Sequence, residues 1–295
     1  MSESSTEVTI RDCGPRDGLQ GEHPLDVDVR LRLARDLASA GLRDIEAAAF
    51  VSPRAVPSMA GAAEIVAQLP DDGTNWWVLV PNLRGAEMAV AAGASHITVT
   101  VSASPVYSEK NVHMTIDESL AQVAEIRAAA STATIDVVVS CSFGSSFGDR
   151  VTVADVVGVC TRLRQLGADH ITLADTTGTA TPRRIESVLA RTGTDVGLHL
   201  HDTRATALTN AVAAYHFGVR RFDTGIGGIG GSPFAPGAGG NLATEDLVML
   251  LEDMGVPTGI DLAALIDVSR GLGTILGREL PSRVARAGPL PEFAE

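Results

Sequence analysis

Two histidines separated by one residue, His199 and His201, form the strongest chemical signal in the sequence. The surrounding run Val196–His201 predicts a strand, in which positions i and i+2 point to the same side, so both imidazoles would face one point. Asp17, which follows an earlier predicted strand, adds a carboxylate. Nitrogen and oxygen ligands together suit a divalent ion such as Mg²⁺, Mn²⁺, Fe²⁺ or Zn²⁺. The alternative is a pair of histidines that only form hydrogen bonds in a polar barrel mouth.

Further ionisable side chains stand where predicted strands end. Arg16 directly precedes Asp17, Glu46 ends the second predicted strand, and Asp175 follows the sixth. The carboxyl ends of the strands in a parallel barrel meet at one rim, where catalytic groups gather. We therefore expect these side chains to form one site with the histidine pair.

Other residues carry weaker signals. His96 and His170 begin predicted strands, which places them at the opposite, amino-terminal end of a barrel as structural residues. His113 lies in the segment Ser102–Ile116, which we interpret as an active-site loop, and is a candidate lid residue. Arg54 either contacts an anionic substrate or is solvated.

A glycine-rich segment, Gly225–Asn241, follows the last predicted strand and contains eight glycines in seventeen residues. Three interpretations are open: a phosphate cradle, which barrels often form after their last strands, a lid with glycine hinges, or a passive linker. A structureless segment of this length inside a compact barrel is uncommon unless it has a function.

The elements that must position these residues alternate short apolar strands with longer amphipathic helices. Four helices end in a glycine a few residues before the next strand, at spacings of about two strand–helix units. This repeat predicts an α/β fold, the (β/α)8 TIM barrel. An open doubly wound sheet is the alternative, but no GxGxxG follows the first strand. The predicted strands are Glu7–Cys13, Arg43–Ala48, Trp76–Val80, His96–Val101, Ile135–Cys141, His170–Ala174, Val196–His201 and Arg221–Thr224.

We interpret residues 1–295 as a single TIM-barrel domain with its core at about residues 7–277. After the eighth unit, Asp261–Gly277 predicts an extra C-terminal helix. The tail, residues 281–295, has three prolines and is expected to be poorly ordered.

The composition excludes several classes of protein. Acidic residues outnumber basic ones by 36 to 23, for a net charge of −13, which argues against nucleic acid or an anionic membrane surface as a partner. Three cysteines without CxxC spacing argue against a disulfide framework. The polar start and the lack of an apolar run of ~18 residues lead us to expect a soluble, cytoplasmic protein. Lys110 is the single lysine and lies outside the predicted strands, which excludes a lysine Schiff-base aldolase.

The sequence carries a series of motifs at Arg16–Gln20, Ile45–Glu46, Phe50–Arg54, Val56–Pro57, Leu198–Thr203, Gly228–Gly231 and Gly239–Leu247. Together these motifs resemble the 3-hydroxy-3-methylglutaryl-CoA lyase family. The resemblance covers about residues 7–275, and implies a metal-dependent lyase that cleaves a 3-hydroxy-acyl-CoA to acetyl-CoA and a keto acid by retro-Claisen or retro-aldol chemistry. It also suggests a homodimer. The segment from Ser102 to Ser119 is similar to the family's loop after strand four.

The resemblance also implies the cofactor and the site residues. The cofactor would be a divalent cation, Mg²⁺ or Mn²⁺ rather than Zn²⁺, with the ligands Asp17, His199, His201 and Asn241. Arg16 would polarise the thioester carbonyl, Glu46 would support the site, and Asp175 would assist proton transfer. The implied catalytic set is Arg16, Asp17, Glu46, Asp175, His199 and Ser232. Substrate-binding residues would be Gln20, Arg54, Lys110, Asn111 and His113.

One position departs from the family pattern. The family's glycine-rich loop carries a catalytic cysteine between two glycines and a proline, and here that position is Ser232. A thiol with a pKa of ~8.5 exchanges a proton near neutral pH far more readily than a hydroxyl. Three interpretations follow: a slow lyase of the usual substrate; a lyase of another 3-hydroxy-acyl-CoA, such as citramalyl-CoA, with water, His113 or Asp175 as proton donor; or a non-catalytic metal-binding relative. An aldolase of a free hydroxy-keto acid is a further alternative.

Overall fold

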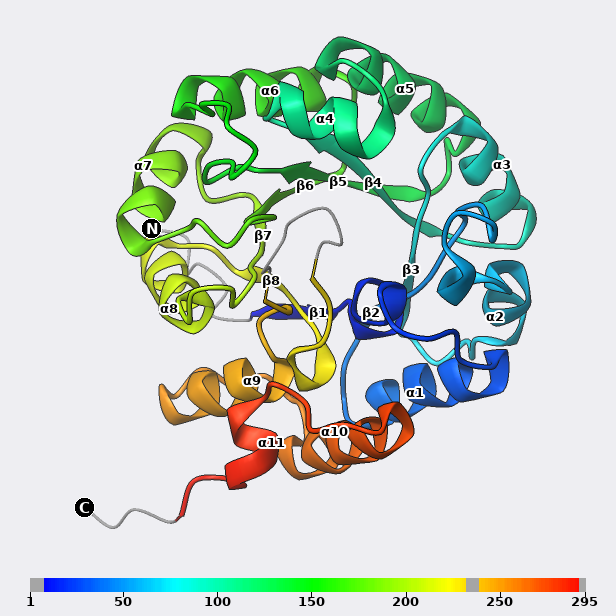
Figure 1. Ribbon diagram of the computed structural model, residues 1–295, viewed down its shortest axis with the longest axis vertical. Helices are drawn as coiled ribbons and strands as arrows, with labels where there is room; N and C mark the ends of the chain where they lie inside the picture. The colour runs from blue at the N-terminus through cyan, green and yellow to red at the C-terminus, as the bar shows by residue number, and fades with distance from the viewer. Residues whose placement is uncertain (1–7, 232–238, 292–295) are drawn as a thin grey trace.

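Eight parallel strands form a closed barrel in this computed structural model, which describes residues 8–231 and 239–291. Each strand pairs with its sequence neighbours, and β8 pairs with β1 to close the ring (Figure 1). The predicted (β/α)8 fold class is therefore confirmed. The strands are β1 (Thr9–Asp12), β2 (Asp44–Ala49), β3 (Asn75–Leu79), β4 (His96–Ser102), β5 (Thr134–Ser140), β6 (His170–Ala174), β7 (Gly197–His199) and β8 (Arg221–Thr224).

Strand β7 is shorter than predicted because the chain changes partners after His199. His201 forms an isolated bridge with Asn241, which lies at the end of the glycine-rich segment. The backbone amide of Leu242 donates to the carbonyl oxygen of Leu200 at 2.8 Å and continues this pairing. A contact between distant parts of the chain therefore places the second histidine at the barrel rim.

Helices surround the barrel on the outside (Figure 1). Several begin at a side chain that caps the first turn: Asn82 accepts a hydrogen bond from the amide of Gly85, and Thr115 forms a capping box with Glu118. The helices around the barrel are α1 (Val27–Ser39), α2 (Ala62–Gln68), α3 (Leu83–Ala91), α4 (Pro105–Val112), α5 (Ile116–Ala129), α6 (Val153–Gln165), α7 (Pro182–Thr192), α8 (Ala207–Phe217) and α9 (Thr244–Asp253).

The segment Ser102–Ile116 contains α4, so the expectation of a loop is wrong. Ser104 caps this helix by accepting a hydrogen bond from the amide of Tyr107 at 3.0 Å. Pro105 occupies the first helical position, where the missing N–H has no partner to lose. This Ser-Pro start is a helix signal, and it is sufficient here despite the polar composition that follows.

The expected extra helix is present as α10 (Leu262–Leu276), and a further helix, α11 (Arg283–Ala287), follows it. The tail is therefore not poorly ordered over residues 281–291, contrary to expectation; residues 292–295 lie outside the described part of the chain. Val284 is buried, and Asp246 of α9 accepts hydrogen bonds from the Ser282 hydroxyl at 2.8 Å and from the Val284 amide at 2.9 Å. These contacts to a distant helix outweigh the proline content.

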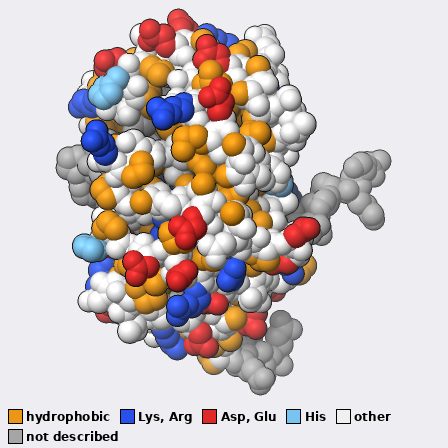
Figure 2. All heavy atoms as spheres, turned by 90° about the vertical axis from the view of Figure 1, so that its right-hand side faces the viewer, with side chains coloured by type: hydrophobic (Ala, Val, Ile, Leu, Met, Phe, Trp, Pro, Cys, Tyr) orange, Lys and Arg blue, Asp and Glu red, His pale blue; other side chains and the backbone are white. Residues whose placement is uncertain are grey.

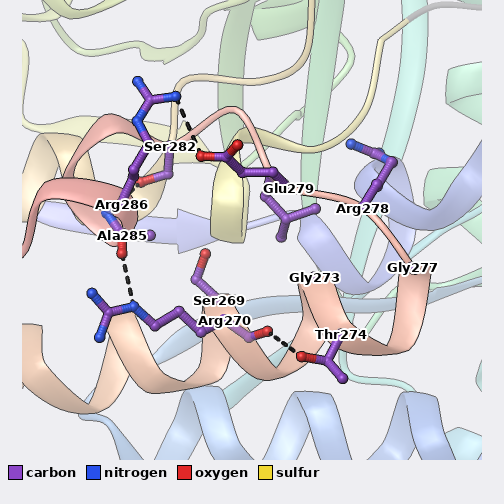
Figure 3. Close-up of a pocket in the computed structure, with 11 residues that line it drawn as sticks. Ser269, Arg270, Gly273, Thr274, Gly277, Arg278, Glu279, Ser282, Ala285 and Arg286 are labelled. Carbon is purple, nitrogen blue, oxygen red and sulfur yellow. Dashed lines mark hydrogen bonds and ion pairs between the residues drawn. The ribbon is translucent and has the colours of Figure 1, made fainter.

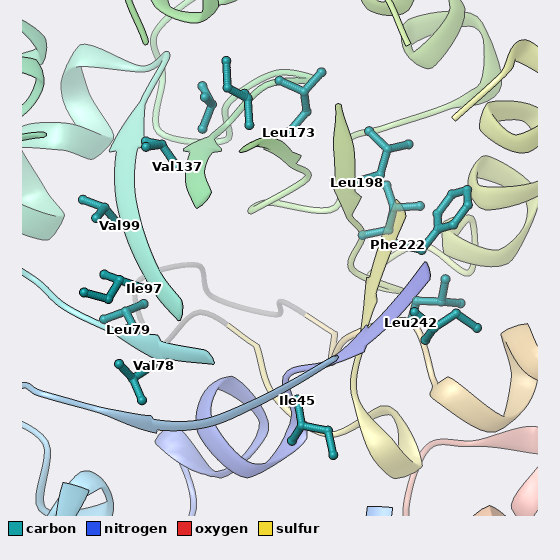
Figure 4. Packing of buried hydrophobic residues seen from close by; sticks show 14 of the residues in the cluster. Ile45, Val78, Leu79, Ile97, Val99, Val137, Leu173, Leu198, Phe222 and Leu242 are labelled. Carbon is teal, nitrogen blue, oxygen red and sulfur yellow. The ribbon is translucent and has the colours of Figure 1, made fainter. Parts of the chain in front are cut away.

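Alternation along the strands separates two environments. Apolar side chains such as Ile97, Val137 and Leu198 are fully buried in the hydrophobic core (Figure 4). Their strand neighbours differ: Asp136 and His199 line cavities at opposite ends of the barrel. Because successive strand residues point to opposite faces, polar side chains collect inside the barrel and apolar ones between strands and helices.

The surface is mixed in charge. On the face shown in Figure 2, Lys and Arg side chains are interspersed with Asp and Glu, and apolar groups lie between them. Among the helices of the described ranges, none combines the length and the hydrophobicity that crossing a membrane requires.

Candidate active site and metal centre

Three of the predicted metal ligands lie together at the rim. Asp17, His199 and His201 present ligand atoms that all lie within 4.8 Å of one another. The Nε2 atoms of the two histidines are 3.1 Å apart, and both residues are buried. Asp17 reaches them from the turn Gly14–Gly18, which follows β1. The two imidazoles therefore face one point at the end of β7.

Asn241 joins this cluster from the far end of the glycine-rich segment. Its Nδ2 donates to Oδ2 of Asp17 at 2.8 Å and to the carbonyl oxygen of Ile229 at 3.0 Å. Its Oδ1 is buried and has no hydrogen-bond partner among the residues that the structure describes. An unpaired oxygen beside two imidazoles and a carboxylate is a donor set that fits a divalent cation.

The protonation states of the cluster also suit a metal. Burial would raise the pKa of Asp17, but Arg16 and the two histidines outweigh it and lower this pKa to about 2. Burial, reinforced by His199, lowers the pKa of His201 to about 4. Burial also acts to lower the pKa of His199, but the hydrogen bond and charge of Asp223 raise it overall. At neutral pH, Asp17 is a carboxylate and His201 a neutral imidazole, which are the forms that bind metals.

Arg16 is held firmly beside the cluster. It lies in a π-helical turn, where the amide of Gly18 donates to the carbonyl oxygen of Cys13 at 3.1 Å. Its guanidinium donates to Oε2 of the fully buried Glu46 and, at 2.9 Å, to Oδ1 of Asp17. Two carboxylates therefore fix the direction in which this cation points.

A cavity of about 340 Å³ opens on the cluster and contains Arg16, Asp17, His199 and His201 in its lining. Its apolar wall comes from side chains such as Val51 and Leu79. Two of the predicted substrate-binding residues also line it, Gln20 and Asn111. Sequence reasoning missed the hydroxyl groups of this cavity. They belong to Thr100, Tyr107, Ser140 and Thr176.

The positions of Thr100 and Ser140 in the predicted strands could have identified them as cavity residues. Thr100 and Val138 are both cavity residues from neighbouring strands, and they are register partners in the β4–β5 pair. Ser140, two residues after Val138, points to the same side because strand side chains alternate. Strand alternation counted from the predicted rim residues would therefore have identified them.

Three predicted substrate-binding residues do not line this cavity. Arg54, Lys110 and His113 are all exposed. The Nζ atom of Lys110 lies 5.1 Å from the centroid of the Phe147 ring, and His113 ends α4 in a left-handed conformation, with φ of 55°. Any contact of these residues with a substrate would occur outside the cavity.

Asp175 is buried at the end of β6 and is not among the residues that line the cavity. Its Oδ1 accepts hydrogen bonds from the amides of Thr179 at 2.7 Å and Ala180 at 2.9 Å. The following residue, Thr176, lines the cavity instead. Burial raises the pKa of Asp175 to about 6, against these hydrogen bonds. The structure therefore gives Asp175 a loop-holding contact and does not bring it to the metal ligands.

The glycine-rich segment is described on both sides of Ser232, while Ser232 itself lies outside the described residues. On one side, the amide of Gly227 donates to both carboxylate oxygens of Glu245, and Gly231 lines the cavity. On the other side, a Cβ at Gly240 would lie 1.8 Å from the carbonyl oxygen of Gly228, so a larger residue there is excluded. The two flanks thus pack on each other and present Asn241 to the site, which a passive linker would not do.

A second cavity, of about 530 Å³, lies between α10 and the segment that leads to α11 (Figure 3). Three arginines that the sequence patterns did not identify line this cavity: Arg270, Arg278 and Arg286. Arg278 forms an ion pair with Glu22, two residues after Gln20 of the first cavity. This ion pair links a residue of the second cavity to the segment after β1 that also carries Gln20.

The opposite, amino-terminal mouth of the barrel holds a third cavity, of about 300 Å³. His96 and His170 line it, as expected for histidines that begin strands. The ring of Trp77 lies 4.9 Å from the His96 ring and 6.2 Å from the His170 ring, measured between centroids. These two histidines are thus remote from the metal-ligand cluster.

Comparison with known proteins identifies the family to which this chain belongs. The HMGL-like family model matches residues 7–271. The (R)-citramalyl-CoA lyase of Chloroflexus aurantiacus is 43% identical over 96% of this chain and 95% of its own length. The hydroxymethylglutaryl-CoA lyase of Pseudomonas mevalonii is 43% identical over 95% of this chain and 96% of its own length.

A solved structure agrees with these sequence matches. The structure of an HMG-CoA lyase from Acenitobacter baumannii in complex with coenzyme A and 3-methylmalate has a TM-score of 0.93 and 38% identity, covering 100% of this chain and 99% of that chain. The family resemblance inferred from the motifs is confirmed along nearly the whole sequence. This chain belongs to the HMGL-like family.

Proposed function

We propose that this chain is a metal-dependent carbon–carbon lyase that cleaves a 3-hydroxy-acyl-CoA to acetyl-CoA and a keto acid. The observation that carries the proposal is one cavity lined by Arg16 and by the ligand atoms of Asp17, His199 and His201. The cleavage requires removal of the proton from the 3-hydroxyl group and stabilisation of the enolate that leaves. Relatives named as lyases of hydroxymethylglutaryl-CoA and citramalyl-CoA support this reaction class.

The residues that would hold the cation are Asp17, His199, His201 and Asn241. A bound Mg²⁺ or Mn²⁺ supplies Lewis acidity toward oxygen atoms of the substrate. We favour these ions over Zn²⁺ because half of the donor set is oxygen, which suits harder cations. The pKa of His201, lowered to about 4 by burial, keeps this ligand neutral at physiological pH.

Arg16 is the group that stabilises the developing negative charge. Its guanidinium lines the cavity while Glu46 and Asp17 hold it from behind. A cation that is already oriented needs no reorganisation when charge appears on the thioester oxygen, which is the main source of such stabilisation. Glu46 therefore acts through Arg16 and is a positioning residue.

We also propose a binding region for the CoA portion of the substrate. CoA carries several negative charges on its phosphates. Arg270, Arg278 and Arg286 line the second cavity together with Glu279, which pairs with Arg286. Three arginines and one glutamate leave this lining positive in a chain whose net charge is −13. The ion pair of Arg278 with Glu22 connects this cavity to the segment after β1 that carries Arg16 and Gln20. A CoA ester that extends from the metal ligands along this segment is favoured over a free hydroxy-keto acid.

The acyl group is proposed as 3-hydroxy-3-methylglutaryl or the shorter citramalyl group, since relatives of both names are 43% identical to this chain. The side chain at position 232 provides a chemical test between these two acyl groups. If the missing thiol limits cleavage of 3-hydroxy-3-methylglutaryl-CoA, Ser232→Cys increases kcat about tenfold or more, because general acid–base groups contribute at least that much.

The test is a panel of both thioesters and the matching free acids, with Mg²⁺ or Mn²⁺ and with product identification by mass spectrometry. Release of acetyl-CoA and a keto acid from one thioester supports the proposal, and turnover of the free acids alone would favour the aldolase. No turnover of any compound, with metal still bound, would favour the non-catalytic relative. Ser232→Ala serves as the matched control for Ser232→Cys, and no gain with cysteine excludes the thiol explanation.

A homodimer is the proposed assembly, and sedimentation of the same preparation tests it.

A further inference from the structure

Arg11 is a charged residue in the barrel interior that the proposed reaction does not use. It lies in β1, is 6% exposed, and its guanidinium carbon is 4.9 Å from the centroid of the Trp77 ring. A buried ion pair is weak evidence for added stability, because desolvation cancels much of the attraction. A role for buried Arg11 other than stabilisation must therefore be sought in the residues that it contacts.

Arg11 contacts two carboxylates in different ways. Its Nε and Nη2 donate to Oδ1 and Oδ2 of Asp223 in the neighbouring strand β8, both at 2.8 Å. Its Nη2 also lies 2.7 Å from Oδ2 of Asp136 in β5. The two parallel bonds fix the plane of the Asp223 carboxylate, whereas a single contact to Asp136 balances charge without fixing a plane.

Asp223 connects this pair to the metal-ligand cluster. Its Oδ2 lies 3.1 Å from Nδ1 of His199, and the two residues are register partners in the β7–β8 pair. The ionised Asp223 carboxylate, which accepts hydrogen bonds from Arg11, has no hydrogen to donate. The hydrogen between Asp223 and His199 must therefore be on Nδ1 of His199. The lone pair of the neutral ring is then on Nε2, which faces His201.

We propose that Arg11 is a positioning residue of the metal centre, which clamps Asp223 and thereby fixes the ring plane and the tautomer of His199. This inference rests on the proposed metal site. Partners that orient a ligating histidine typically change metal affinity by about 10–100-fold.

The first test measures Mn²⁺ affinity of the full-length protein by calorimetry, without substrate. Asp223→Asn is expected to weaken binding by about 10–100-fold and Arg11→Met by about tenfold. Asp136→Asn is the matched control, because it makes the same change of carboxylate to amide in the same cluster but leaves the contacts between Arg11, Asp223 and His199 in place. Its affinity stays within about twofold of the wild type, and Arg11→Lys recovers part of the loss.

Equal losses in Arg11→Met and Asp136→Asn would overturn the proposal, because they would reflect general damage to the cluster. So would unchanged affinity in Arg11→Met. If Asp223→Asn does not fold, Arg11→Met and Arg11→Lys still decide the result, since they retain the Asp223 carboxylate.

The second test reads the tautomer directly by ¹⁵N NMR of the histidine rings in metal-free protein. The wild type and Asp136→Asn are expected to show His199 with its hydrogen on Nδ1, and Arg11→Met to show a mixture. A wild-type ring with its hydrogen on Nε2 overturns the inference. If the wild type binds no divalent cation, the proposed function fails at the metal, while this spectrum still decides the role of Arg11.

Discussion

The two ends of the barrel bury charges of the same kinds but arrange them differently. At the amino-terminal mouth, charged and polar groups are directed at each other: Arg11 binds Asp136 and Asp223, and Asp44 accepts a hydrogen bond from the indole of Trp77 at 2.8 Å. The charges of this cluster compensate one another within the protein, although Oδ1 of Asp136 is buried without a hydrogen-bond partner among the described residues.

At the carboxyl rim, acceptor atoms are directed at a common point. The Nε2 atoms of His199 and His201 are 3.1 Å apart, and Oδ1 of Asn241 is buried without a partner among the described residues. Asp17 adds a carboxylate. A set of acceptors without enough donors is a stable arrangement only when a cation or a substrate completes it.

The contrast shows where function lies on this fold. Strands carry polar side chains into the barrel at both ends, but at the rim the loops add Asp17 and Asn241, which converge with the two histidines. Asp223 belongs to both ends, since it accepts from Arg11 and lies 3.1 Å from His199. The amino-terminal cluster therefore supports the rim through one carboxylate.

The largest difference in kcat between variants at the two ends of the barrel is expected when one histidine is replaced at each end. His201→Ala should lower kcat by on the order of 10³-fold or more and abolish tight Mn²⁺ binding, because a ligand is lost from the cluster. His170→Ala at the amino-terminal mouth should change kcat by no more than about twofold, since His170 lines a different cavity. Steady-state kinetics of the two variants in parallel checks this, and equal losses would refute the contrast.

A smaller loss is expected from Arg16→Gln, which leaves all four proposed ligands in place. The fixed charge beside the thioester oxygen is lost, so kcat should fall by about 10²–10³-fold. Mn²⁺ affinity should remain within a few fold of the wild type. Kinetics and calorimetry on one preparation separate the two effects, and a loss confined to metal affinity would assign Arg16 to the metal rather than to the enolate.

The carboxyl of Glu245 provides a pH test of the rim. It is fully buried and accepts from the amide of Gly227, and burial raises its pKa from 4.5 to about 7. The folded state then binds this proton more tightly than the unfolded state, so the free energy of unfolding falls as pH rises from about 4.5 to 7. The shift corresponds to on the order of 3 kcal/mol.

Glu245→Gln should remove this contribution, so that the variant loses less stability than the wild type over the same pH interval. Urea unfolding at pH 5 and pH 7.5 measures the difference between the two proteins. An identical pH dependence in both would show that the Glu245 carboxyl does not titrate in this window.

The smallest effect is expected from Trp77→Phe at the amino-terminal mouth. Phenylalanine keeps an aromatic ring beneath Arg11 but loses the hydrogen bond to Asp44, at a cost of about 1 kcal/mol in the free energy of unfolding. Turnover should stay within about twofold of the wild type. Thermal denaturation and kinetics together check this, and a large loss of turnover would mean that this mouth influences the rim by a route other than Asp223.

Local patterns in the sequence determined the strands, most of the helices and the direction of the histidine pair. Strand periodicity places His199 and His201 on one side, and capping residues such as Thr115 mark where helices begin. These features depend on neighbours within a few residues, so they can be inferred from the chain alone. The motif resemblance extended this to the family and the reaction class.

Local patterns did not determine which distant residues meet: the family resemblance implied that Asn241 joins Asp17, and tertiary structure alone revealed the pairing of Arg11 with Asp223. Asn241 contacts Asp17 across 224 positions, and Arg11 reaches Asp223 across 212, which no local pattern specifies. Asp175 stands at a strand end like the others, yet its carboxylate binds the loop that follows. Position along a strand predicts the rim at which a side chain lies. The direction in which it points beyond the strand depends on loops whose partners come from distant parts of the chain.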